Sequence, residues 1–275
     1  MNFFEALVQF SFLQHALLGG VLASIGCGVM GTYVVVKRIS FLAGGIAHAV
    51  LGGMGLAYYF QGQPIIGALI AAILSALLIG WIKLRWQENE DTLISAIWAI
   101  GMAVGILFIS QTPGYNTDLM SYLFGNILLV TQQDLYLMLV LDILILATVL
   151  LFYKQFLAVT FDEEFARLRG IKVEVFYLLL LCLVALTVVL LIQLVGLILV
   201  IALLSLPAAI ARQHFNSLPR IMGFAVLLGI IFTGGGLMLA YSPDLPAGAT
   251  IILFAGSGYL LSSLIKYAKL YHISE

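Results

Sequence analysis

The sequence predicts an all-α membrane protein that crosses the bilayer about nine times, with its N-terminus outside and its C-terminus in the cytoplasm. Three observations predict this fold class: long apolar stretches, a scarcity of charge, and the placement of the cations. Hydrophobic residues make up 63% of the 275 residues and charged residues only 9%, whereas soluble domains average ~25% charged residues. We therefore expect a single transmembrane domain over residues 1–275 and no water-soluble domain within it.

The predicted spans are apolar stretches close to the ~20 residues that a helix needs to cross ~30 Å of hydrocarbon. They cover residues 10–36, 41–60, 64–82, 92–110, 134–153, 173–192, 194–211, 220–241 and 247–265. The run from Val175 to Ile210 is too long for one crossing, since a single helix would extend ~54 Å. We interpret Gln193 and Gly196 as a tight hairpin near the outer surface that divides this run into two spans.

The cations predict the orientation of these spans. All twelve Lys and Arg residues lie in alternate gaps, and the intervening gaps contain none. They are Lys37, Arg38, Lys83, Arg85, Lys154, Arg167, Arg169, Lys172, Arg212, Arg220, Lys266 and Lys269. Because Lys and Arg are enriched in cytoplasmic loops, these gaps are predicted to face the cytoplasm. The first span has no basic residue in front of it, so we interpret it as a retained anchor.

Several functions are disfavoured by what the sequence lacks. It has no G-x-x-x-x-G-K-[ST] phosphate loop, no H-E-x-x-H helix and no G-x-S-x-G elbow, so the chain by itself is not expected to hydrolyse ATP or to be an enzyme. The net charge of −1 suggests no nucleic-acid partner. Cys27 and Cys182 lie in different spans and are interpreted as small core residues. Transport is the function class that remains.

The second span carries the most specific local pattern. At helical spacing Gly44, His48 and Gly52 share one face, and Gly45 and Gly53 flank it. Small residues let membrane helices approach closely, so we expect this face to pack against another helix and to carry His48 into the interior. Two interpretations of His48 stay open: a hydrogen bond across a helix interface, or a metal ligand that lines a pathway.

Two further polar side chains are candidate pathway residues. Asp142 lies near the middle of the fifth span, where a carboxylate must be protonated, paired or facing water because an isolated charge in lipid is costly. It is interpreted either as a helix-packing group or as a pathway-lining one. His15 lies near the outer end of the first span and is either an interfacial histidine or a substrate contact.

The longest cytoplasmic loop contains a predicted short helix over residues 160–170. Thr160 with Glu163 matches a capping box, and Gly170 follows as a C-terminal stop. Phe161, Phe165 and Leu168 form one apolar stripe on it. A stripe this short cannot span the membrane, so it either lies on the bilayer or docks into a partner, and the mixed charges around it favour a protein partner.

Motifs spread along nearly the whole chain resemble one family, the integral-membrane permeases of ABC importers for zinc, manganese and related metals. The matching segments are 37–48, 118–128, 162–170, 203–211 and 244–251. The resemblance implies a homodimer in the cytoplasmic membrane, paired with cytoplasmic ATPase subunits and fed by an extracytoplasmic metal-binding protein. It also implies alternating access driven by ATP, with a divalent metal as cargo and no permanently bound cofactor.

The resemblance further implies roles for individual residues. The segment 162–170 resembles the coupling helix that receives the ATPase stroke, which assigns coupling roles to Asp162, Glu163, Phe165, Ala166, Leu168 and Gly170. A metal-site histidine of the family matches His48. This chain has Gly44 and Asn126 where many relatives have acids, so His48 is expected to act with Asp142, with His15 or with backbone carbonyls. Because imidazole suits zinc and carboxylates suit manganese, zinc is favoured.

Two rival functions make different predictions. A stand-alone secondary metal-ion transporter or channel, driven by an ion gradient with Asp142 as proton carrier, would transport without an ATPase. In that protein, changes at Phe165 or Leu168 would matter little. A membrane scaffold without transport activity would tolerate His48→Ala with no change in metal accumulation.

Overall fold

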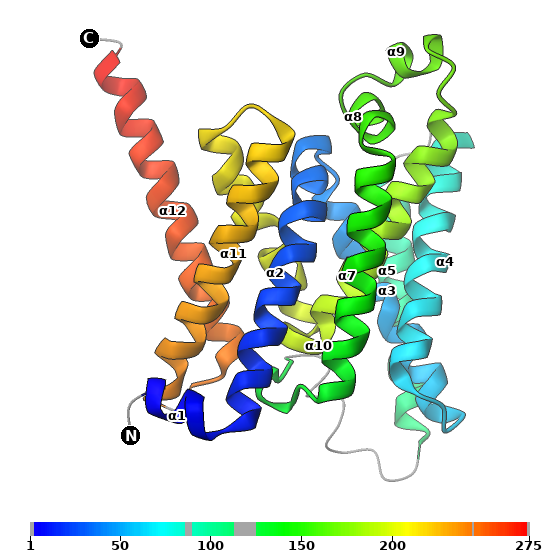
Figure 1. The fold of residues 1–275 in the computed structure, drawn as a ribbon. Coiled ribbons are helices and arrows are strands. Elements are labelled where there is room, and N and C mark those ends of the chain that lie inside the picture. The colour runs from blue at the N-terminus through cyan, green and yellow to red at the C-terminus, as the bar shows by residue number, and fades with distance from the viewer. Residues whose placement is uncertain (1–2, 86–89, 113–124, 244, 274–275) are drawn as a thin grey trace.

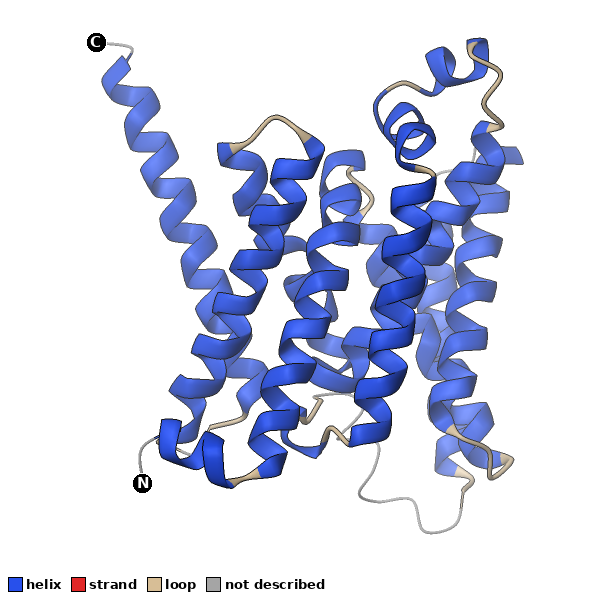
Figure 2. Ribbon diagram, in the orientation of Figure 1, coloured by secondary structure: helices blue, strands red, loops and turns tan. Residues whose placement is uncertain are grey.

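The structure, a computed structural model, describes residues 3–85, 90–112, 125–243 and 245–273. Every regular element in these ranges is a helix (Figure 2). In chain order they are α1 Phe3–Gln9, α2 Ser11–Lys37, α3 Ser40–Tyr59, α4 Pro64–Arg85, α5 Glu90–Ser110, η1 Ile127–Leu129, α7 Gln132–Leu151, α8 Tyr153–Phe161, α9 Glu163–Leu168, α10 Val173–His214, α11 Leu218–Tyr241 and α12 Ala247–Ile273. Asp118 and Asp244, which open two of the family-like segments, lie outside the described residues.

The prediction of an all-α polytopic membrane protein is confirmed. Within the described ranges, eight helical segments are long and apolar enough to cross a membrane, and Val200–His214 is a ninth, shorter apolar helix. The basic loops gather at one end of the bundle, together with the C-terminus, α8 and α9, while the N-terminus and α1 lie at the other end (Figure 1). By the positive-inside rule the first of these ends is cytoplasmic.

The predicted hairpin inside α10 is also confirmed. The 42 residues of α10 would extend ~63 Å as one straight helix, about twice the hydrocarbon thickness. At Gly196 the backbone leaves the helical region, with φ 74° and ψ 171°, and the two arms run in opposite directions. The first arm follows α2 outward until Leu194 lies against Gly19. The second arm returns along α2 to Arg212, which hydrogen-bonds the carbonyl of Val35.

Helix α2 is the centre of the bundle, because its small residues let three other helices approach. The backbone of Leu204 in α10 lies against Gly31, and Val226 of α11 lies against Gly28. The carboxyl group of Asp142 in α7 lies beside Gly26. Close approach of this kind is how membrane helices gain packing energy without a hydrophobic driving force between them.

Two short helices were not predicted. Helix α1 is separated from α2 by Phe10, which has an extended backbone (φ −108°, ψ 116°). Helix α8 occupies residues that the sequence pattern places in the loop after the fifth span. It is held down by Phe156 and Val159, which are both buried. Helix α8 therefore anchors the cytoplasmic loop to the bundle and positions α9 beyond it (Figure 1).

Candidate functional site

The glycine-rich face of α3 lies where α4 and α5 approach it most closely. A Cβ atom on Gly52 would lie 2.9 Å from the carbonyl oxygen of Gly101 in α5. On the neighbouring face, Gly53 lies against the backbone of Gly67 in α4. Gly45 faces Ile94 of α5, and Gly44 faces Ile201 in the second arm of α10. The glycines of α3 thus meet three different helices, which gives this helix almost no lateral freedom.

His48 is held in this packed region by an aromatic partner. Its ring stacks on the indole of Trp98 in α5, with ring centroids 4.1 Å apart and an interplanar angle of 5°. The indole is itself oriented, because its Nε1 donates to the sulfur of Met102 at 3.0 Å. The Nδ1 atom of His48 is buried and has no hydrogen-bond partner among the described residues. A fixed imidazole with an unused ring nitrogen has the chemistry of a metal ligand.

Asp142 is another buried polar group without a hydrogen-bond partner in the described part of the bundle. Its side chain is 2% exposed, and neither carboxyl oxygen has a hydrogen-bond partner among the residues that the structure describes. It faces α2 beside Gly26, and Thr187 of α10 lies against the same glycine. The hydroxyl of Thr187 donates to the carbonyl of Leu183. Burying an unpaired polar group costs free energy, so the position calls for a functional reason.

The structure does not assemble His48, Asp142 and His15 into one cluster. In the described parts of the chain, no three His, Cys, Asp or Glu side chains lie close enough to hold a metal ion. His15 is half-buried near the outer end of α2. Asn126 caps η1 by accepting a hydrogen bond from the backbone N–H of Leu128 at 3.1 Å. Trp98 was not predicted, since nothing in the sequence pattern pairs α5 with His48.

The cytoplasmic loop forms a capped helix, but the predicted capping box is wrong. The N-terminal cap of α9 is Asp162, whose Oδ1 accepts from the backbone N–H of Phe165 at 2.9 Å. Thr160 instead belongs to the last turn of α8, and its hydroxyl is buried without a partner among the described residues. Glu163 turns inward and forms an ion pair with Lys37 at 2.7 Å. Gly170 ends the motif with φ 76°, a conformation that favours glycine.

The apolar stripe on this loop is exposed. Leu168 is 88% exposed, Phe161 61% and Phe165 46%, which is unusual for large apolar side chains at the aqueous end of a membrane protein. Phe161 and Phe165 also line a groove of about 440 Å³ beside Lys154, Leu157 and Arg169. The predicted single stripe is divided in the structure, because Phe161 is the last residue of α8 whereas Phe165 and Leu168 lie on α9 beyond the extended Asp162. Exposed apolar side chains on short helices at this end have the form of a docking surface.

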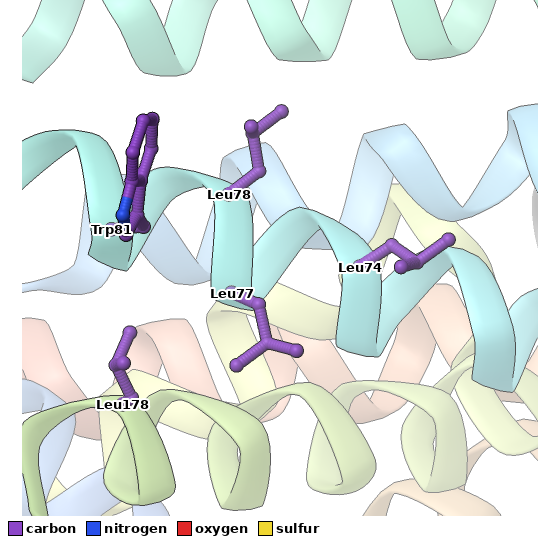
Figure 3. A pocket seen from close by; sticks show the side chains of 5 residues that line it. All are labelled: Leu74, Leu77, Leu78, Trp81 and Leu178. Atoms are coloured by element: carbon purple, nitrogen blue, oxygen red, sulfur yellow. The ribbon is translucent and has the colours of Figure 1, made fainter. Parts of the chain in front are cut away.

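A second groove, between α4 and α10, has a different character. Its volume is about 480 Å³, and it is lined by Leu74, Leu77, Leu78 and Trp81 of α4 and by Leu178 of α10. In Figure 3 Leu77 and Leu178 point into the space between the two helices. None of the five lining side chains carries a charge or a metal ligand, so this groove is not a candidate metal pathway.

Apolar helices long enough to cross the membrane, together with a short capped helix that exposes apolar side chains at the cytoplasmic end, fit the membrane subunit of a transporter. Residues 9–266 match the model of the ABC 3 transport family, and the chain belongs to that family. It is a multi-pass permease of an ABC metal importer, the transmembrane subunit of such a transporter.

Individual relatives agree with this assignment. The chain is 45% identical to a protein of Chlamydia pneumoniae named "Probable metal transport system membrane protein", over 95% of this chain and 93% of that one. It is 35% identical to the manganese transport system membrane protein MntC of Halalkalibacterium halodurans, over 94% and 89% of the two chains. Among solved structures, PsaBC from Streptococcus pneumoniae in complex with Fab superposes with a TM-score of 0.86 at 34% identity, covering 94% of each chain.

Proposed function

We propose that the chain works as a homodimer with two cytoplasmic ATPase subunits, and that α9 is the coupling helix on which an ATPase docks. The observation that carries this proposal is the exposed stripe of Phe161, Phe165 and Leu168 at the cation-rich end. Burial of one such side chain contributes ~1.5–3 kcal/mol, so a partner that covers all three would gain binding free energy from them. The resemblance supplies the partner's chemistry, a P-loop ATPase.

The proposed second copy of the chain has support in the burial of the outer helices. Only 17% of the apolar window of α5, and equally 17% of that of α12, is buried inside one chain. Such helices must be covered by lipid or by another protein surface. We propose that a second copy covers part of this surface, that lipid covers the rest, and that an extracytoplasmic metal-binding protein delivers the cargo at the outer end.

We propose a divalent first-row transition metal as the cargo. The relatives in Halalkalibacterium halodurans and in Listeria monocytogenes carry manganese in their names. Manganese is therefore the first metal to test, although the sequence favoured zinc. His48 is the proposed ligand on the path, and Asp142 and His15 are further candidate contacts. Alternating access then moves the metal past His48 when the ATPase motion rearranges the dimer.

The decisive experiment is co-purification with a docking variant as control. The tagged chain is extracted from native membranes in mild detergent, and bound proteins are identified by mass spectrometry. We expect a P-loop ATPase with the wild type and its loss with Phe165→Asp/Leu168→Asp. Both side chains are exposed, so the variant is expected to fold. Reproducible recovery of the chain alone would instead favour a stand-alone secondary transporter.

Cargo identity requires a separate measurement. Wild-type complex in proteoliposomes is given ATP, the metal-binding protein and either manganese or zinc, and metal uptake is counted. We expect manganese to be taken up in preference to zinc. Preferential uptake of zinc would instead support the zinc prediction made from imidazole chemistry.

A further inference from the structure

Lys37 links the cytoplasmic loop to the central helix of the bundle. It is the last residue of α2, and its side chain is only 9% exposed. Its Nζ donates to Oε1 of Glu163 at 2.7 Å and to the backbone carbonyl of Val159 at 2.8 Å. The same ammonium group lies 5.3 Å from the centroid of the Tyr177 ring in α10. One cation therefore contacts α8, α9 and α10.

These contacts connect residues on both sides of Asp162, which joins α8 to α9. That residue is called the joint below. Helices α8 and α9 are separated by Asp162, whose backbone is extended (φ −152°, ψ 99°). Val159 lies on the α8 side of that joint and Glu163 on the α9 side. Because Lys37 binds both, it holds the angle between the two helices and ties that angle to the end of α2.

We propose that Lys37 is a positioning residue for transport: its bonds to Glu163 and Val159 form the strut that transmits movement of α9 into α2. This inference rests on the proposed docking of an ATPase on α9. It also changes the role of Glu163, whose carboxylate is turned toward Lys37 and so acts within the permease.

Helix α2 is suited to carry such movement. Its glycines place Asp142 of α7 against Gly26 and the backbone of Leu204 against Gly31. Packed interiors of this kind do not deform gradually but shift between discrete arrangements. A displacement at Lys37 is therefore passed along α2 to its interfaces with α7 and α10. Asp142 lies in the interface with α7.

A second ion pair on α9 provides a matched control. Arg167 bonds Glu174 at 2.8 Å, and both side chains are half-exposed. This pair joins α9 to the first turn of α10 without reaching α2. Exposed pairs contribute little free energy, whereas the mostly buried Lys37 is shielded from solvent. Removing Arg167 therefore tests general loosening of α9, and removing Lys37 tests the strut.

The experiment compares wild type with Lys37→Met, Glu163→Gln and Arg167→Gln, each purified with its ATPase and placed in proteoliposomes with manganese as cargo. Three quantities are measured: co-purified ATPase, ATP hydrolysis, and manganese taken up per ATP. For Lys37→Met we expect co-purification and hydrolysis to be retained, with uptake per ATP reduced about fivefold or more. Glu163→Gln keeps a hydrogen-bond acceptor without the charge, so we expect a reduction of about two- to fivefold. Arg167→Gln should stay within about twofold of wild type.

The strut is overturned if Lys37→Met and Glu163→Gln both keep the wild-type uptake per ATP. It is equally overturned if Arg167→Gln lowers manganese uptake per ATP as much as Lys37→Met and Glu163→Gln do. It is also overturned if these two variants lose uptake because the ATPase no longer co-purifies. If Lys37→Met does not reach the membrane, Glu163→Gln decides alone, because its side chain is 43% exposed and the substitution keeps its shape. Failure of the wild type itself to couple ATP to uptake would instead overturn the proposed function, and the strut with it.

Discussion

The guanidinium of Arg212 donates a hydrogen bond to the carbonyl oxygen of Val35 at 2.8 Å, joining residues that are 177 positions apart. Val35 lies two residues before the end of α2, at the cytoplasmic end of the bundle. Arg212 lies near the end of α10, whose first turn holds Glu174, the partner of Arg167 in α9. Both ends of α10 therefore lie at the same membrane surface, and its two arms form a hairpin.

The first prediction concerns the turn of that hairpin. We expect Gly196→Ala to lower stability by about 1–3 kcal/mol, because its backbone conformation is one that only glycine adopts readily. The measurement is the midpoint of thermal unfolding of the purified protein in detergent. Gly256→Ala is the matched control, since Gly256 is helical and has open space where a Cβ would lie. Equal midpoints for the two variants would contradict the assigned turn.

The second prediction concerns the packing of α3 on α5. We expect Gly52→Ala to destabilise the protein by about 1–3 kcal/mol, because the new methyl group would meet the backbone carbonyl of Gly101, which cannot rotate away. Gly44→Ala is the control on the same helix, since its Cβ would meet only the flexible end of Ile201. The midpoint of thermal unfolding should be clearly lower for Gly52→Ala than for Gly44→Ala. The reverse order of midpoints would refute this packing.

The third prediction concerns His48. We expect His48→Ala to reduce manganese uptake by about tenfold or more, the range found when a metal site loses a supporting group, while ATPase co-purification is unchanged. His214→Ala serves as control, because His214 is exposed and bonds Ser262 at the cytoplasmic end. Uptake is measured in proteoliposomes. If His48→Ala transports at the wild-type rate, the imidazole only packs against Trp98.

The fourth prediction concerns Asp142. We expect Asp142→Leu, which has a similar branched shape, to raise stability by about 1–3 kcal/mol, because it removes a buried polar group without hydrogen-bond partners. Asp142→Asn leaves a polar group in place and should gain less. Both are compared with wild type by thermal unfolding of the purified permease. A loss of stability in Asp142→Leu would mean that the assembled protein supplies this carboxyl group with a partner.

The cytoplasmic loop shows where the sequence pattern was sufficient and where it was not. The stop at Gly170 was predicted correctly, because a helix that ends in a left-handed residue favours glycine locally. The cap at Thr160 was wrong because α8 already includes that residue, which leaves Asp162 to cap α9. Helix α8 itself was missed because its buried residues, Phe156 and Val159, pack against tertiary neighbours that local patterns do not reveal.

The candidate site likewise has some features that the sequence predicted and others that it did not. The sequence placed His48 on a glycine-rich helical face, since spacing along one helix is a local property. Its stacking on Trp98 depends on the pairing of α3 with α5, which no single stretch of sequence specifies. The contact of Lys37 with Glu163 was likewise not predicted, because the two residues are 126 positions apart.

By itself the sequence determined the class, the spans and the orientation of this protein. The reason is that the free energy of placing a stretch in lipid depends mainly on that stretch and its flanking charges. Only the tertiary structure decided which side chains meet. It left Asp142 without a partner among the described residues, fixed the ring of His48 on Trp98, and brought Lys37 to Glu163. Close packing between helices, which depends on the shapes of distant segments together, sets those contacts.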